Sequence, residues 1–386
     1  MSAPGSASAT GPVLITGGAG FIGANLADRL AADGHRVHIF DALARPGVER
    51  NVDWLRARHA DRIAVTVADI RDAQAVADAA RTASAVFHFA AQVAVTTSLV
   101  DPREDFDVNL QGTIHILEAL RRRGDQTPLI FASTNKVYGD LADIDLAVRD
   151  EAYLPADDDL RARGISEERP LDFHTPYGCS KGAADQYVLD YCRSFGVPTA
   201  VMRMSCIYGP RQMGTEDQGW VAHFLIRALA GEPISIYGDG RQVRDILFVD
   251  DAIEAYVEAW RQIDRVKGRA FNLGGGPANA VSLIQLIAEI EALTGVKVEA
   301  GFYPWRAGDQ RYYVSDTRRV RQELGLGAPV AWRTGLARLA QWLKNEALPG
   351  TLAARLPRAA AAESASVPRP APEPIAASAP RRMVGA

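Results

Sequence analysis

The sequence predicts an α/β protein with a doubly wound parallel sheet and a smaller α/β lobe towards the C-terminus. Short apolar runs alternate with helical patterns, the first run leads straight into closely spaced glycines, and a Tyr-x-x-x-Lys pair opens a long helical pattern after residue 174. Strands that alternate with helices form right-handed β-α-β units and hence a parallel sheet. The glycine segment therefore follows a strand directly, at the edge of the sheet where ligands bind.

Length and composition set the broad class. The 386 residues can bury a full core in two joined lobes. The 43 basic and 47 acidic residues give a formal charge of -4 and form no basic stripe, so we expect no nucleic-acid partner. No long apolar run and no basic-then-apolar leader occur, which favours a soluble, cytoplasmic protein with no membrane partner.

Three cysteines give a further indication of the compartment. Cys179, Cys192 and Cys206 are odd in number and lack the spacing of metal ligands or of a Cys-x-x-Cys motif. We therefore expect a reducing compartment, no structural disulfide and no metal site. The cysteines are interpreted as small buried hydrophobic residues.

The fold is predicted to begin after a disordered arm of small polar residues at 1–10, with a strand at 13–16. A glycine turn and a helical pattern follow. Gly17, Gly20 and Gly23 permit the turn, the approach of a pyrophosphate and the packing of helix against strand, although a purely structural turn is the alternative. The residues of this segment predicted to bind a dinucleotide are Gly17, Gly20, Phe21, Ile22 and Gly23.

A second strand at 36–40 ends at Asp41, which strengthens the dinucleotide prediction. Its carboxylate can accept hydrogen bonds from both hydroxyls of an adenosine ribose. The same charge would repel a 2′-phosphate, so NAD is favoured over NADP, while Arg45 leaves NADP open.

The alternation continues with strands at 63–67 and 85–89 and a helix between them that ends near residue 81. Asp69 could contact the adenine edge or could cap a turn. His88 is interpreted as a packing residue of its strand. The cofactor-binding candidates at these strand ends are Asp69, Ile70, Ala90, Ala91 and Gln92.

The next helix is predicted from about 108 to 123, with Asn109 near its start as a further cofactor candidate. The strand that follows at 129–132 leads to Thr134. Because ligands lie at the carboxyl ends of strands in an open α/β sheet, Thr134 is expected to face a substrate.

The tyrosine helix is predicted to run to about residue 195. Tyr177 and Lys181 are four residues apart and share a face near its start. A nearby ammonium, the helix N-terminus and an oxidised nicotinamide could lower the pKa of the phenol from about 10 to roughly 7, so that Tyr177 could remove a hydroxyl proton while hydride leaves the same carbon. A core tyrosine beside a solvated lysine is the alternative.

We expect a dinucleotide-binding domain over 11–205, and residues 140–173 are unusually long for a connection within it. A lid, a binding loop and an inserted surface segment remain open for this insertion. The smaller lobe is predicted over 206–346, with segments at about 241–275 returning to the first domain. The Ala- and Pro-rich residues 347–386 predict a disordered tail.

Two arginines of the smaller lobe are candidates for a diphosphate clamp. Arg244 and Arg306 could present forked donors to phosphate oxygens. Ion pairing with Asp245 or Asp309 is the alternative.

The glycine triplet, Asp41, Thr134, Tyr177 and Lys181 together resemble the extended short-chain dehydrogenase/reductase superfamily of NAD-dependent epimerases and dehydratases, over roughly residues 12–345. The resemblance implies a Rossmann-like fold, with Tyr177 and Lys181 as the catalytic pair and Thr134 as the catalytic Ser/Thr. It also implies NAD as the cofactor.

A closer likeness is to the CDP-paratose 2-epimerase (CDP-tyvelose epimerase) family, in the segments 133–140, 171–187, 217–221 and 242–245. This likeness implies a nucleotide-diphosphate hexose as substrate, tightly held NAD and a homo-oligomer, a dimer or a tetramer. The substrate-binding candidates are Thr134, Asn135, Lys136, Cys206, Gln218, Trp220, Tyr237, Arg244, Arg306, Asp309 and Gln310.

Asn135 and Lys136 bear on the reaction type. Sugar-nucleotide 4,6-dehydratases carry Asp-Glu at these positions as an extra acid and base, so dehydration is disfavoured here. The resemblance implies inversion of carbon 2 of a CDP-linked hexose through a 2-keto sugar. A 4-epimerase or another redox enzyme of UDP- or GDP-hexoses, mildly disfavoured by Cys206 where 4-epimerases carry asparagine, and a non-catalytic NAD sensor remain as alternatives.

Overall fold

Seven parallel strands form the large sheet of the molecule, in the order β12-β8-β5-β4-β1-β2-β3. The computed structural model describes residues 11–347. Strand order reverses between β1 and β4, and the carboxyl ends of strands at such a reversal form a crevice for ligands. The parallel sheet confirms the predicted fold class. Its strands are β1 Val13–Thr16, β2 Val37–Asp41, β3 Ile63–Val67, β4 Ala85–His88, β5 Leu129–Thr134, β8 Thr199–Met204 and β12 Arg269–Leu273.

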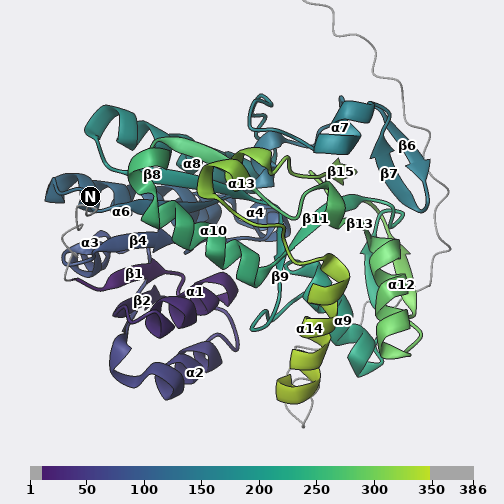
Figure 1. Cartoon of the computed structure of the whole chain (residues 1–386), viewed down its shortest axis with the longest axis horizontal. Helices are drawn as coiled ribbons and strands as arrows, with labels where there is room; N and C mark the ends of the chain where they lie inside the picture. Colours follow the sequence, from purple (N-terminus) through teal and green to yellow (C-terminus); the bar gives the residue numbers. More distant parts are fainter. Residues whose placement is uncertain (1–10, 348–386) are drawn as a thin grey trace, which may run out of the picture.

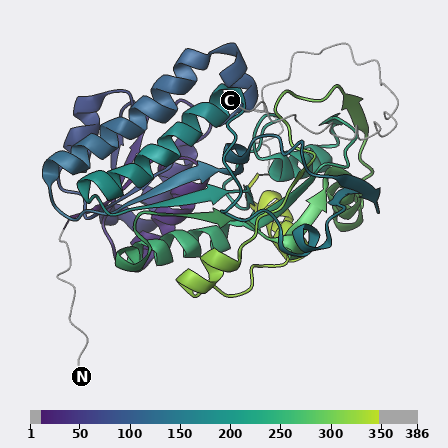
Figure 2. The same cartoon turned by 90° about the horizontal axis from the view of Figure 1, so that it is seen from above.

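Helices cover both faces of this sheet, which is why its strands are continuous apolar runs. One layer contains α1, α2 and α10, and the opposite layer contains α3, α6 and α8; Figure 2 shows the sheet between them. The helices of this lobe are α1 Phe21–Ala32, α2 Glu49–His59, α3 Ala73–Ala80, α4 Val95–Val100, α5 Pro102–Phe106, α6 Gly112–Arg123, α8 Thr175–Phe195, α10 Val249–Arg261, α11 Ile263–Val266 and α13 Arg318–Leu324.

A smaller lobe follows, with its own apolar core. Its central strand β11 pairs with β13, β15 and β9, while β10 and β14 form a separate parallel pair. Figure 1 shows α9, α12 and α14 packed around these strands. The elements are β9 Cys206–Tyr208, β10 Ile234–Tyr237, β11 Val243–Phe248, β13 Ala280–Ser282, β14 Ala300–Tyr303, β15 Tyr312–Tyr313, α9 Trp220–Ala230, α12 Leu283–Thr294 and α14 Trp332–Trp342.

The chain returns to the large sheet later than expected. The segment 241–275 was predicted to rejoin the first domain, but β11 belongs to the small sheet, and only α10 and β12 lie with the large one. An apolar run specifies a buried strand without specifying its sheet, because pairing depends on distant residues.

Residues 140–173 are ordered rather than a structureless loop. They contain an antiparallel hairpin, β6 Leu146–Arg149 with β7 Ala152–Pro155, and the helix α7 Asp158–Arg163. Tyr153 Oη donates to Asp239 at 2.8 Å, and Ile165 N donates to the Val314 carbonyl at 2.7 Å. These contacts attach the insertion to the small lobe, as Figure 1 shows, and favour the inserted-surface interpretation.

The structure also contains several short helical turns. The predicted helix at 108–123 opens with a π-helical turn, η2 Asp107–Gln111, which carries Asn109. Other short turns are η1 Ala60–Arg62, η3 Asn135–Tyr138, η4 Pro277–Asn279 and η5 Leu343–Ala347. The expected arm and tail, 1–10 and 347–386, lie outside the described residues apart from residue 347. Within 11–347 no helix combines the length and apolar character needed to cross a bilayer.

Candidate active site

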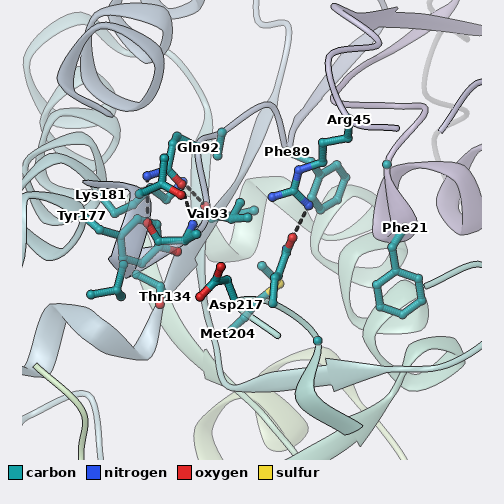
Figure 3. Close-up of a pocket in the computed structure, with 18 of the residues that line it drawn as sticks. Phe21, Arg45, Phe89, Gln92, Val93, Thr134, Tyr177, Lys181, Met204 and Asp217 are labelled. Carbon is teal, nitrogen blue, oxygen red and sulfur yellow. Dashed lines mark hydrogen bonds between the residues drawn. The ribbon is translucent and has the colours of Figure 1, made fainter. Parts of the chain in front are cut away.

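A cavity of about 940 Å³ opens between the two lobes (Figure 3). Its walls include the glycine turn, the carboxyl ends of strands of the large sheet and loops of the small lobe. Most predicted site residues line it. They are Gly17, Gly20, Phe21, Ile22, Gly23, Asp41, Asp69, Ile70, Ala90, Ala91, Gln92, Thr134, Asn135, Lys136, Tyr177, Lys181, Cys206, Gln218, Trp220, Tyr237, Arg244, Arg306 and Asp309.

The glycine turn forms one end of the cavity and opens α1. Gly17 has a φ of +69°, which favours glycine, and a Cβ there would lie 2.6 Å from Ala90 N. At Gly23 a Cβ would lie 2.3 Å from the Gly17 carbonyl oxygen, so backbone packs directly on backbone. Gly20 is the N-cap of α1 and lines the cavity. The N-terminus of α1 can therefore receive an anion.

Asp41 and Asp69 lie at the ends of β2 and β3. The Asp41 carboxylate accepts hydrogen bonds from Ala19 N at 3.0 Å and from Leu43 N at 2.8 Å while facing the cavity. Asp69 also lines the cavity, but its carboxylate accepts bonds from the backbone N and the guanidinium of Arg71. These contacts are those expected of an aspartate that caps a turn, which was the alternative to a contact with the adenine edge.

The catalytic candidates come together where β5 meets α8. Pro176 opens α8, and the four-residue spacing places Tyr177 and Lys181 in the cavity wall beside Thr134 at the end of β5 (Figure 3). All three are buried, and a hydrogen bond joins Tyr177 to Thr134. Lys181 Nζ donates to the Ala132 carbonyl at 2.7 Å and lies 4.2 Å from the centre of the Phe131 ring.

Burial dominates the pKa values of Tyr177 and Lys181. Burial raises the pKa of Tyr177 to about 12, although the Thr134 hydrogen bond and Arg45 act in the opposite direction. Burial also lowers the pKa of Lys181 to about 7 against the carboxylates of Asp185 and Asp105. Spacing in the sequence placed the pair on one face, but it could not show how strongly burial would shift the two pKa values.

The residues after Thr134 bind to the small lobe. Lys136 Nζ donates to the Gly308 carbonyl at 3.1 Å and lies 3.4 Å from Asp309 Oδ1, which also accepts a bond from Arg244 Nη2 at 2.7 Å. Burial lowers the pKa of Lys136, and Asp309 opposes this shift. Arg244 therefore pairs with Asp309, as one alternative expected.

Arg306 is held by acidic residues of the loop before α9. Its guanidinium contacts Glu216 and lies 3.3 Å from Asp217 Oδ1, and it stacks 3.8 Å from the centre of the Tyr237 ring. Asp309 is not its partner. Both arginines predicted to clamp a diphosphate thus line the cavity with carboxylates already against them.

Two predicted residues do not line the cavity. Asn109 is buried behind it, where its Oδ1 accepts a bond from Gln92 N at 2.9 Å and so fixes a segment that does line it. Gln310 is fully buried and donates to the Gly139 carbonyl at 2.6 Å. Both were predicted as ligand contacts. Asn109 supports the cavity residue Gln92, and Gln310 also accepts a bond at 3.3 Å from Nδ2 of the cavity residue Asn135.

Other cavity residues were not predicted. Phe89, Val93 and Met204 line its apolar part, and Asp217 faces it from the small lobe (Figure 3). Phe89 directly follows β4, and Met204 ends β8, so their strand-end positions were a usable signal. Asp217 opens the segment 217–221 that carries the closer family likeness, so this segment was a usable signal for it.

The cavity residues fit a dinucleotide better than a metal ion. A glycine turn at a helix N-terminus suits a pyrophosphate, and the adjacent carboxylate of Asp41 suits ribose hydroxyls. Among residues 11–347, no cluster of three or more His, Cys, Asp or Glu side chains could hold a metal ion. The three cysteines are free, and Cys179 is exposed rather than buried as expected.

Known proteins resemble this chain over most of its length. Residues 13–274 match the NAD dependent epimerase/dehydratase family. The CDP-paratose 2-epimerase of Salmonella typhi is 38% identical over 343 residues, which cover 86% of this chain and 99% of the relative.

Solved structures also share the fold. The UDP-glucose 4-epimerase of Thermotoga maritima with UDP-glucose has a TM-score of 0.73 and 29% identity, covering 86% of this chain and 98% of its own. The UDP-glucose 4-epimerase of Thermus thermophilus in complex with NAD has a TM-score of 0.74 and 29% identity, covering 87% and 99%. With the family match and the glycine turn, Asp41 and the Thr134, Tyr177 and Lys181 group around one cavity, the chain belongs to the NAD dependent epimerase/dehydratase family.

Proposed function

We propose that this protein inverts carbon 2 of a CDP-linked hexose, of the CDP-paratose to CDP-tyvelose type, through a transient 2-keto sugar. The observation that carries the proposal is the grouping of Thr134, Tyr177 and Lys181 in one cavity with Asn135 and Lys136 beside them. The 38% identity to a CDP-paratose 2-epimerase supports the choice of carbon and nucleotide.

NAD would be held along the large-lobe side of the cavity. We assign its pyrophosphate to the glycine turn, its adenosine ribose to Asp41 and its nicotinamide half to Tyr177 and Lys181, all of which line the cavity. When bound, NAD supplies a positively charged acceptor for hydride from the sugar carbon and returns that hydride later. The reaction needs no net oxidant, which favours tight retention of the cofactor.

The protein's own part is proton transfer and orientation. Tyr177 takes the proton of the carbon-2 hydroxyl as that carbon is oxidised, and Thr134 donates a hydrogen bond to the same oxygen. Burial raises the pKa of Tyr177 to about 12, and the Thr134 hydrogen bond and Arg45 act against this shift. We assign a further contribution in the same direction to the ammonium of Lys181, one helical turn away. After the ketone presents its other face, Tyr177 returns the proton, and the configuration at carbon 2 is inverted.

The residues next to Thr134 argue against a dehydration. Asn135 and Lys136 carry no carboxyl group, and Lys136 is engaged with Asp309 and the Gly308 carbonyl. A β-elimination needs a further acid and a further base from the protein, placed next to the sugar. Redox at one carbinol needs only the three catalytic candidates.

Proton NMR tests the proposal directly. Purified protein is incubated with CDP-paratose in deuterated water without added NAD, and the sugar configuration and product mass are followed. We expect inversion at carbon 2 without deuterium uptake. Uptake at the inverted carbon would contradict internal hydride return.

Two variants of α8 complete this test. Tyr177→Phe should abolish turnover with folding intact, whereas Tyr187→Phe, at an exposed position of the same helix, should remain active. Activity of the Tyr177→Phe enzyme would overturn the assignment of the base. Inversion of UDP-glucose at carbon 4 without action on CDP-paratose would instead identify a 4-epimerase, the activity named for the two solved structures above.

We also propose a homo-oligomer. Large apolar side chains are exposed on α4, α5 and α8, three helices that pack on one another, and Val100 is 86% exposed. Exposed apolar side chains on neighbouring helices favour association. Light scattering should show a dimer or tetramer, and Val100→Lys should reduce the measured mass; a monomeric wild type would contradict the proposal.

A further inference from the structure

Asp105 is a fully buried carboxylate behind the catalytic helix. It lies on α5 with 0% of its surface exposed, whereas Arg103 and Glu104 beside it face solvent. A buried carboxylate is strongly destabilising unless hydrogen-bond donors surround it. A carboxylate retained at such a place therefore needs an explanation from its contacts.

Three side chains from three segments donate to this carboxylate. Ser180 Oγ donates to Oδ2, while Asn109 Nδ2 at 3.1 Å and Gln92 Nε2 at 3.2 Å donate to Oδ1. Ser180 directly precedes Lys181 on α8, and Gln92 lines the cavity beside it, as Figure 3 shows. Asp105 thus connects the catalytic helix to the cavity segment after β4.

Asp105 and Asp185 are the two carboxylates that act on Lys181, and they differ in how their charge is compensated. Apart from burial, Lys181 is influenced first by Asp185 on its own helix and then by Asp105 on α5, and it acts on His88 of β4. Asp185 accepts two bonds from Arg203 at 2.9 Å, so its charge is already compensated.

The three donors to Asp105 are neutral, which leaves Lys181 as the cation that acts on it. Tyr177 is influenced by Asp105 and by Arg45.

We infer that Asp105 is a positioning residue for the Tyr177 and Lys181 pair: it fixes this turn of α8 through Ser180, and it supplies a negative charge, held by neutral donors, that favours the ammonium form of Lys181. The inference rests on the proposed function and names a residue outside the Thr134, Tyr177 and Lys181 group. Asp105 acts through these residues, since it does not line the cavity.

The direction of the effect follows from the sign of the charge. Asp105 opposes the burial that lowers the pKa of Lys181 to about 7, and it adds to the burial that raises the pKa of Tyr177. Asp105→Asn keeps the shape but removes the charge, so both pKa values should fall. Both limbs of the pH profile of activity, which the protonation states of Tyr177 and Lys181 determine together, should therefore move to lower pH.

The decisive measurement does not depend on the substrate. The chain has five lysines, so ¹³Cε-lysine NMR of the holoenzyme gives few signals, and the one missing from Lys181→Met belongs to Lys181. Its titration midpoint should fall by about one pH unit in Asp105→Asn. Asp107→Asn is the matched control, because the Asp107 carboxylate pairs with Arg103 on α5 rather than with a residue of α8. An unchanged midpoint in Asp105→Asn would overturn the charge role even if CDP-paratose is not the substrate.

Activity tests the second half of the inference. With whichever nucleotide hexose the wild type converts, the optimum pH of Asp105→Asn should be lower than that of wild type and of Asp107→Asn. Ser180→Ala keeps the carboxylate but removes its bond to α8, and it should lower kcat about tenfold with little change in KM. An unchanged kcat in Ser180→Ala would overturn the positioning role. If the titration midpoint of Lys181 shifts in Asp105→Asn but the wild type does not convert CDP-paratose, the role of Asp105 stands and only the proposed substrate is wrong.

Discussion

Arg45, in the loop after β2, donates a hydrogen bond to Gln218, 173 positions later in the loop before α9 (Figure 3). Both side chains line the cavity, so the bond joins the wall that carries Asp41 to the wall formed by the small lobe. Arg45 also acts electrostatically on Tyr177 and Asp41. The two lobes are therefore connected across the space assigned to the cofactor.

Loss of this connection should weaken cofactor retention. In Gln218→Ala the guanidinium of Arg45 loses its partner, and a hydrogen bond to a charged group contributes about 1.5–3 kcal/mol, so NAD should dissociate about tenfold faster or more. The NAD content of purified protein after timed dialysis measures this rate. Gln341→Ala, at an exposed position on α14, serves as the control. Equal retention in wild type and Gln218→Ala would contradict the prediction.

The glycine turn allows folding and cofactor binding to be separated. A Cβ at Gly23 would lie 2.3 Å from the Gly17 carbonyl oxygen, so Gly23→Ala should destabilise the fold by about 3 kcal/mol. A Cβ at Gly20 would lie 3.1 Å from the same oxygen, and the φ of -68° suits alanine, so Gly20→Ala should fold almost normally.

At Gly20 the methyl group would stand where a pyrophosphate must approach the helix N-terminus. We therefore expect Gly20→Ala to lose NAD affinity. Urea unfolding and NAD titration of both variants check this pair of outcomes. If Gly20→Ala binds NAD as tightly as wild type, the glycine turn is not part of the cofactor site.

The sequence predicted the regular elements of the large sheet well. The strands at 13–16 and 63–67 and the helix end near residue 195 are confirmed. Apolar runs flanked by turns leave few alternatives, and Gly196 ends α8 in a left-handed conformation. The predicted return to the first domain at about 241–275 holds for α10 and β12, whereas β11 lies in the small sheet, because an apolar run fits either sheet.

The site was predicted less completely. Spacing in the sequence brought Tyr177 and Lys181 to one face, but burial and the pairing of Arg244 with Asp309 depend on segments far apart. Asp105 could have been noticed, because it lies four residues before Asn109 and shares its face. Because exposed acidic residues flank Asp105 in the sequence, its position alone does not distinguish it from a surface carboxylate.

Stability should depend on pH through Lys181. The pKa of Lys181 is about 7 in the folded protein, whereas a lysine in the unfolded chain keeps its proton to about 10.5. Between these values the unfolded state binds more protons, so this group makes the folded state more stable as pH rises, by up to about 1.4 kcal/mol per pH unit. Lys181→Met removes the titrating group.

The free energy of unfolding, measured by urea at about pH 7.5 and about pH 9 on protein freed of NAD, should rise more for wild type than for Lys181→Met. Equal changes in the two proteins would show that Lys181 keeps an ordinary pKa.

The buried pair of Arg203 on β8 and Asp185 on α8 offers a last test, because it lies one helical turn beyond Lys181. Both side chains are nearly inaccessible, and Arg203 Nε and Nη2 each donate at 2.9 Å to the carboxylate. Arg203→Met would leave Asp185 buried and unpaired, so unfolding free energy should fall by about 3–5 kcal/mol.

Arg193→Met is the matched control on the same helix. Its partner Asp190 is solvated and Arg193 is 81% exposed, so the loss should stay below about 1 kcal/mol. Replacing both members of the buried pair, Arg203→Met with Asp185→Leu, should recover much of the stability, because the destabilising unpaired charge is gone. If the double variant is as unstable as Arg203→Met, the penalty comes from packing around β8 rather than from the charge of Asp185.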